Sequence, residues 1–205
     1  MTLAAPFSSS MRLGRQAAFG PALASPRLRL RPMASGDVER IYEANRGLNR
    51  RYLASPPLDP EKLEELCRMF ESEWHRYGLG YRMVCHDDET VGHVRLKYIA
   101  DRTSGRAAEL TFATDAAHRD KGYATEAVGV VVADAFERAG MDYVVACIDP
   151  DVEAAARVVE KNGFAWVSTG KMHGRVMRRY ILPLAMWRAQ RRAMGVLPSP
   201  IATDL

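Results

Sequence analysis

Residues 109–128 read ELTFATDAAHRDKGYATEAV, and the spacing of their apolar residues changes halfway along from that of a strand to that of a helix. Its start belongs to an apolar run, Ala107 to Thr114, that predicts a strand, and from Ala124 onward apolar residues recur at helical spacing. The first amides of a helix have no partner inside it, so the joining turn is a candidate anion site, most naturally for phosphate. Arg119 and Lys121 add positive charge, and Gly122 allows close approach to the backbone. Many such turns bind nothing, so the turn alone leaves both interpretations open.

The whole chain has the composition of a globular protein. Its 205 residues are 47% hydrophobic and 26% charged, which excludes collagen-like, coiled-coil and wholly disordered chains and predicts one domain. The apolar runs are too short for a transmembrane helix. We expect a mobile extension over 1–26, a folded domain over 27–190 and a loose tail over 191–205. The Ser- and Ala-rich extension also resembles a transit peptide, although we favour a cytoplasmic protein.

Positive charge is concentrated at the two ends. Residues 1–36 carry five Arg and no acidic residue, and residues 171–205 carry seven basic residues and one acidic residue. The segment between them is acidic. Since the basic residues do not form one patch interleaved with aromatic residues, the sequence does not favour nucleic-acid binding, and a basic RNA-associated protein is kept as a weaker alternative.

The pattern beyond the central stretch predicts a mixed α/β chain. Strands are expected at 27–31, 81–86, 91–99, 107–114, 143–148, 165–169 and 176–184, and helices from Val38, over 61–74, from Ala124 to Gly140 and from Asp149 to Asn162. Three of these strands follow one another through short turns, which is typical of an antiparallel meander. A strand–helix–strand crossover follows it.

Cysteine and histidine do not indicate a metal or a disulfide. Cys67, Cys85 and Cys147 are widely spaced among apolar neighbours, which favours packing in a reducing compartment. His93, His118 and His173 lie on different predicted elements without metal-ligand spacing. We therefore predict no metal site.

Two motifs resemble a known family. Arg119-x-x-Gly122-x-Ala124 matches the Arg/Gln-x-x-Gly-x-Gly/Ala turn of the GNAT superfamily of acetyl-CoA-dependent N-acetyltransferases. The sequence of residues 121–127 resembles that of the branch of ribosomal-protein N-terminal acetyltransferases, and so does ARVVEKNGF, residues 156–164. The resemblance covers roughly residues 27–190.

The resemblance implies a fold and a cosubstrate. The fold would be α/β (α+β), with a mixed, mostly antiparallel sheet that splays at its central strands and carries helices on both faces. Acetyl-CoA would bind there, its pantetheine arm along Phe112, Ala113 and Thr114. Its pyrophosphate would bind the turn amides, from Arg119, Asp120, Lys121, Gly122, Tyr123, Ala124 and Thr125.

Glu109 is the candidate catalytic base. The resembling branch often carries Glu at this position, where it could take the proton of an attacking amine. The alternative is that Glu109 only pairs with Arg106 or Arg95 across the meander.

The chain also departs from the branch. Asp120 stands where the branch usually has Gly, and Val152 and Ala155 stand where it has Asn and Ser. In the branch, that Ser is the usual acid that protonates the departing thiolate. Here water would have to protonate the thiolate instead.

The expected function is N-acetyl transfer from acetyl-CoA to a primary amine, of a small molecule or a protein N-terminus, by direct attack in a ternary complex. The alternative is a non-catalytic CoA-binding sensor or interaction module on the same fold. Arg46, Arg50, Arg51 and Tyr52 suggest an anionic acceptor. A homodimer is left open, and no membrane partner is expected.

Overall fold

A single mixed sheet organises the chain. The computed structural model describes residues 20–41, 60–101, 105–172 and 174–195. The sheet has eight strands in the order β1-β2-β3-β4-β5-β6-β8-β7. Their bounds are β1 Leu23–Ala24, β2 Arg29–Pro32, β3 Tyr81–His86, β4 Glu89–Asp101, β5 Gly105–Thr114, β6 Tyr143–Ile148, β7 Ala165–Met172 and β8 Arg175–Pro183. All neighbours pair antiparallel except β5 and β6, which are parallel.

The sheet opens between β5 and β6. Their pairing joins Ala107–Leu110 to Tyr143–Ala146 and goes no further along the described strands. Strand β5 continues to Thr114 beside β4 alone, while the end of β6 stays with β8. The expected splay at the central strands is therefore present, and it leaves one side of residues 111–114 without a neighbouring strand.

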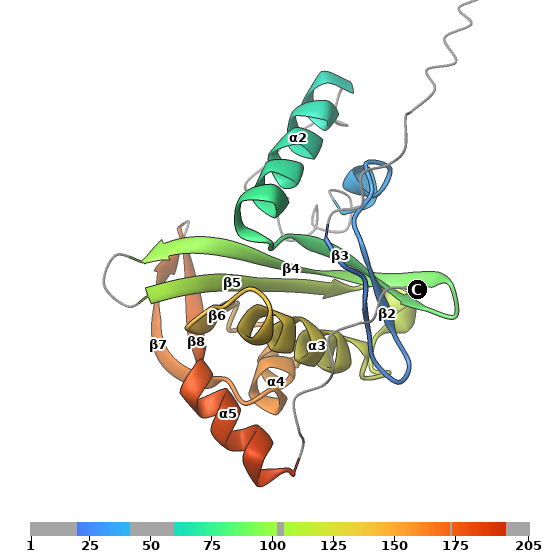
Figure 1. The fold of residues 1–205 in the computed structure, drawn as a ribbon. Coiled ribbons are helices and arrows are strands. Elements are labelled where there is room, and N and C mark those ends of the chain that lie inside the picture. Colours follow the sequence, from blue (N-terminus) through green and yellow to red (C-terminus); the bar gives the residue numbers. More distant parts are fainter. Residues whose placement is uncertain (1–19, 42–59, 102–104, 173, 196–205) are drawn as a thin grey trace, which may run out of the picture.

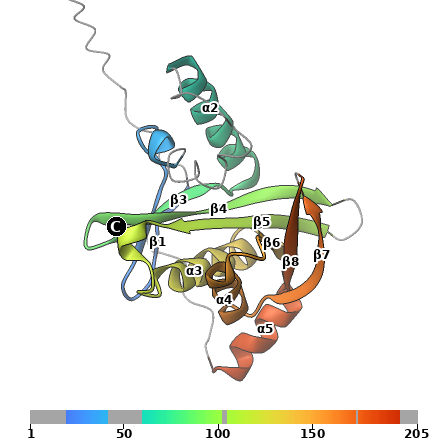
Figure 2. The same cartoon turned by 180° about the vertical axis from the view of Figure 1, so that it is seen from behind.

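Helices cover both faces of the sheet. Figure 1 shows α2 (Pro60–Tyr77) on one face and α3 (Tyr123–Glu137) and α4 (Glu153–Lys161) on the other, with α5 (Leu184–Ala193) beneath β8. Figure 2 shows the same layers from behind. None of the described helices has the length and the apolar run needed to span a bilayer.

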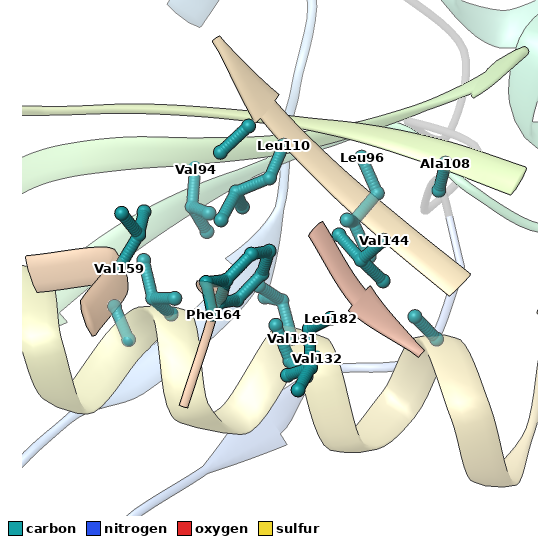
Figure 3. Close-up of a cluster of buried hydrophobic side chains, with 14 of the residues drawn as sticks. Val94, Leu96, Ala108, Leu110, Val131, Val132, Val144, Val159, Phe164 and Leu182 are labelled. Atoms are coloured by element: carbon teal, nitrogen blue, oxygen red, sulfur yellow. The ribbon is translucent and has the colours of Figure 1, made fainter. Parts of the chain in front are cut away.

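The main core lies between the sheet and α3. Alternate residues of β4, β5, β6 and β8 point to this side and meet the inner faces of α3 and α4 (Figure 3). The labelled members are Val94, Leu96, Ala108, Leu110, Val144, Leu182, Val131, Val132, Val159 and Phe164. A second cluster, which includes Phe70, Tyr81 and Met83, packs α2 on the opposite face.

The structure departs from the expected elements in three places. The described fold begins before Arg27, because Leu23 and Ala24 pair with β2 and Leu23 is buried. Helix α5, absent from the expected order, is held by Trp187 against Phe136, with 5.2 Å between ring centroids. Helix α4 begins at Glu153 and not at Asp149, because the Asp149 side chain and carbonyl accept the amides of residues 151 and 152 in a turn.

Candidate active site

The turn between β5 and α3 has the backbone of an anion site. Gly122 is the N-cap of α3 with φ +80°, a left-handed conformation that glycine adopts without strain. The first helical bond runs from the Glu126 amide to the Gly122 carbonyl, so the three preceding amides have no partner within the helix. Arg119 and Lys121 are exposed beside them. The turn can therefore take a phosphate by amide donors, helix dipole and cationic side chains together.

Asp120 lies inside this turn in a left-handed conformation. Its φ is +61°, which Asp tolerates better than most residues and which explains why the resembling branch has Gly there. The residue is exposed, and among the described residues its carboxylate forms no ion pair with Arg119. Solvent therefore screens its negative charge, and no cation of the described segments pairs with it.

A small pocket lies under the turn, where β4, β5 and α3 meet. Five predicted cofactor residues line it, together with Gly92 and His93 of β4. These five are Phe112, Ala113, Thr114, Tyr123 and Ala124. The structure thus brings the predicted arm-binding strand and the predicted phosphate turn together, with Arg119, Asp120, Lys121, Gly122 and Thr125 completing the turn.

Glu109 lies just before the sheet opens. It is half-buried on β5, with Lys97 and Val145 as its Cα partners on the two sides. Since Ala108 and Leu110 face the main core, Glu109 points to the opposite face. Arg95 pairs with Glu73 at 2.7 Å, and among the described residues Glu109 has neither a hydrogen bond nor an ion pair. No contact between Glu109 and Arg95 or Arg106 is present among the described residues, so the structure does not support the alternative that Glu109 only pairs with one of them.

Cys147 shares that face. Burial raises the pKa of its thiol, the Glu109 carboxylate raises it further, and Arg179, its Cα partner on β8, partly offsets them. The thiol therefore stays protonated near neutral pH. This agrees with a packing role for Cys147 and not with a nucleophilic one.

The sequence did not single out Ser25 and Arg27. Both reach Glu126 in the first turn of α3, and Arg27 also donates to the Lys121 carbonyl. Residues 25 and 126 are 101 positions apart, so no spacing rule joins them. The only signal was an Arg at the start of an alternating strand.

Other predicted residues lie elsewhere or outside the described part. Burial lowers the pKa of His93 to about 4, and His118 hydrogen-bonds Glu89 at 3.1 Å. No cluster of three or more His, Cys, Asp or Glu within the described ranges could hold a metal ion. The acceptor-side residues Arg46, Arg50, Arg51 and Tyr52, and also His173, lie outside the described residues.

Comparison with solved structures finds the same fold in several acetyltransferases. An acetyltransferase from Agrobacterium tumefaciens is 23% identical with a TM-score of 0.61, over 79% of this chain and 94% of that one. Mycobacterium smegmatis RimJ, solved in complex with CoA-disulfide, is 16% identical with a TM-score of 0.66, over 85% and 93%. Ribosomal-protein-S5-alanine acetyltransferase from Vibrio fischeri is 17% identical with a TM-score of 0.66, over 82% and 98%.

Comparisons of the sequence with curated proteins and with family profiles test which family the chain belongs to. No curated protein matches the chain significantly. A profile of the acetyltransferase (GNAT) domain matches residues 27–165, which is more than half of the chain and contains both motifs. The resemblance inferred from residues 119–124 and 156–164 is thereby confirmed. This chain belongs to the GNAT family of acetyltransferases and is an acyltransferase by class.

Proposed function

We propose that this chain transfers the acetyl group of acetyl-CoA to a primary amine by direct attack within a ternary complex. The observation that carries the proposal is the opening between β5 and β6 beside the Gly122 turn. An extended ligand can enter the opening and place a pyrophosphate on the turn amides. Acetyl-CoA has that shape, and its thioester supplies an activated acetyl group.

Strand β5 would hold the arm of the cosubstrate. Beyond Leu110 the backbone of Phe112, Ala113 and Thr114 lacks a strand on the β6 side. Free N–H and C=O groups along such an edge pair with amide groups of an extended ligand. This arrangement brings the two reactants into line, and such positioning is worth roughly 7–11 kcal/mol of the barrier in the best cases.

Glu109 would remove the proton of the amine. Its carboxylate is at the inner end of the opening and is not engaged by another described side chain. It can act directly or through one water molecule. Ala155 has no hydroxyl, so the departing thiolate would take its proton from water.

The acceptor would carry a negative charge besides its amine. Lys97 and Arg179 are exposed on the same face as Glu109, one on each side of it across the sheet. An amine bound at Glu109 would thus lie between two cations, which favours an acidic small molecule or an acidic N-terminal segment.

The test is turnover by Glu109→Gln. The rate of thiol release from acetyl-CoA, with a panel of neutral and anionic amines, should fall about 10²–10⁴-fold, which is typical for loss of a general base. The Kd for acetyl-CoA should stay unchanged. Glu64→Gln, an exposed change on α2, is the matched control. Wild-type turnover by Glu109→Gln would refute the role of the base.

A second candidate is a sensor that binds CoA without turnover. Asp120, Val152 and Ala155, which depart from the resembling branch, favour it. Thermal stabilisation by acetyl-CoA without thiol release from any amine would support the sensor. Thiol release that depends on an amine would exclude it.

A further inference from the structure

The loop between β1 and β2 donates several hydrogen bonds to the first turn of α3. The Ser25 hydroxyl donates to Oε1 of Glu126 at 2.6 Å, and the Arg27 amide donates to the same oxygen at 3.1 Å. The Arg27 guanidinium donates from Nε to Oε2 at 2.7 Å. Both oxygens of one carboxylate are therefore held by a segment that is a hundred residues away in the sequence.

Arg27 also touches the phosphate turn itself. Its Nη1 donates to the Lys121 carbonyl at 3.1 Å, and its guanidinium carbon lies 5.2 Å from the centre of the Tyr123 ring. A Cβ on Gly122 would lie 3.4 Å from Nη2 of the same residue. One side chain thus contacts or borders three consecutive residues of the turn.

The Glu126 carboxylate puts a negative charge in the first turn of α3, next to the amides that would bind an anionic pyrophosphate. Its side chain is only 18% exposed, so solvent screens it weakly. Partial burial raises the pKa of Glu126, but the hydrogen bonds from Ser25 and Arg27 outweigh this and bring the pKa below its ordinary value. The carboxylate is therefore ionised at neutral pH. Within the first turn of the helix, an unneutralised carboxylate would repel a bound phosphate.

We propose that Arg27 is a positioning residue for the cosubstrate: it neutralises Glu126 and fixes the backbone of Lys121–Tyr123 so that the turn amides present to a pyrophosphate. The inference rests on the proposed function, since it assumes that CoA binds this turn. Arg27 itself need not touch the ligand, because its donors are directed to Glu126 and to the Lys121 carbonyl.

A double-mutant cycle in the full chain tests this role. Binding of CoA is measured by calorimetry, and kcat is measured at saturating acetyl-CoA. Arg27→Ala should raise the Kd for CoA about tenfold or more, which corresponds to 1.4 kcal/mol or more. It should leave kcat within about twofold. Arg27→Ala with Glu126→Gln should recover most of the affinity, because the exposed negative charge is gone.

Two further variants separate charge from folding. Glu126→Gln alone should bind CoA at least as well as the wild type, since a side-chain amide oxygen still accepts from Ser25. Arg31→Ala is the matched control: Arg31 is on β2, four residues after Arg27, and pairs with Asp37, so its loss should leave the Kd unchanged.

Each failure has its own meaning. If Arg27→Ala folds and binds CoA as the wild type does, or if Glu126→Gln weakens binding tenfold, the role assigned to Arg27 is overturned and the proposed function stands. If Arg27→Ala does not fold, the Glu126→Gln result decides. If the wild-type chain takes up no CoA, both proposals fall together.

Discussion

Asp120, in the turn between β5 and α3, is a charged residue with a left-handed backbone conformation that glycine adopts more easily. Asp120 adopts φ +61°, where Gly carries no penalty, and it adds a negative charge between Arg119 and Lys121. Asp is among the few residues that tolerate this conformation. The turn thus keeps its shape without the glycine of the resembling branch, at the expense of electrostatic attraction for an anion.

Removal of that charge should tighten binding. Asp120→Asn keeps a residue that tolerates the left-handed conformation and loses only the charge. The Kd for CoA should fall about three- to tenfold at low salt, and the gain should shrink as ionic strength rises, since exposed charges are screened. Calorimetry at two salt concentrations checks this, with Glu64→Gln as the control. A Kd that is unchanged at low salt would show that the carboxylate does not act on the ligand.

His93 should make stability depend on pH. Burial lowers its pKa to about 4 from 6.5; Asp115 raises the pKa and Arg40 lowers it. Below pH 6.5 the unfolded chain binds a proton that the folded chain rejects until about pH 4. Stability is therefore lost as pH falls through this window, by about 3 kcal/mol at most.

Urea unfolding at several pH values measures this loss. His93→Gln should flatten the decline between pH 6.5 and 4, whereas His75→Gln, on the exposed face of α2, should retain the wild-type slope. Equal slopes for the wild type and His93→Gln would mean that His93 is not the group responsible.

The turn between β5 and α3 could be predicted from the sequence because its residue types are dictated locally, whereas its binding of phosphate stays a prediction. A left-handed N-cap selects Gly122, and small residues allow approach to the backbone. The contacts of Arg27 could not be predicted, since they depend on a hairpin folding back onto α3. Tertiary contacts of this kind leave no periodic signal along the chain.

Among the elements, α4 begins without a side-chain cap. Val152 is its N-cap, is 39% exposed and makes no side-chain cap hydrogen bond. The resembling branch has Asn at this position, and Asn is among the best N-cap residues. The Ala155 amide bonds the Val152 carbonyl at 3.0 Å, so the amides of residues 153 and 154 are the ones left without a partner inside the helix.

Val152→Asn should stabilise the chain by about 1 kcal/mol and raise Tm by roughly 2–4 °C for a chain of this size. Val152→Ala, which cannot cap, should not. Thermal unfolding followed by circular dichroism compares the two. If Val152→Asn melts no higher than Val152→Ala, then α4 gains nothing from a cap.

Elements with strong internal patterns could be predicted closely. The bounds expected for β3 and β6, Tyr81–His86 and Tyr143–Ile148, coincide with those observed. Two-residue β1 is too short to carry alternation. Helix α5 is mostly exposed or half-buried and is fixed by one buried side chain, Trp187, whose partner Phe136 is on α3. Contacts with other elements, not local preference, determine these two.

At the scale of the whole molecule, a buried charge cluster joins β3 to α3. Asp134 accepts from Arg82 at 3.0 Å and from Arg138 at 2.6 Å, and Arg82 lies over the Trp74 ring of α2. The side chains of Arg82 and Asp134 are 3% and 5% exposed. The cluster links the layers on both sides of the sheet.

Asp134→Ala should destabilise the fold by about 3–5 kcal/mol, because it leaves a buried guanidinium without its counter-charge. Urea unfolding measures the change. Glu153→Ala, which breaks the exposed pair with Arg157, should change stability by less than about 1 kcal/mol. Similar small effects for both variants would show that the cluster is not structurally important.

The open sheet and the turn between β5 and α3 together should bind CoA. Calorimetric titration of the full wild-type chain with CoA measures this binding, with Gly122→Val as the variant that a left-handed N-cap should not tolerate. Saturable binding of one CoA per chain is expected, weakened by salt and by Gly122→Val. Heats indistinguishable from dilution for the folded wild-type chain would contradict it.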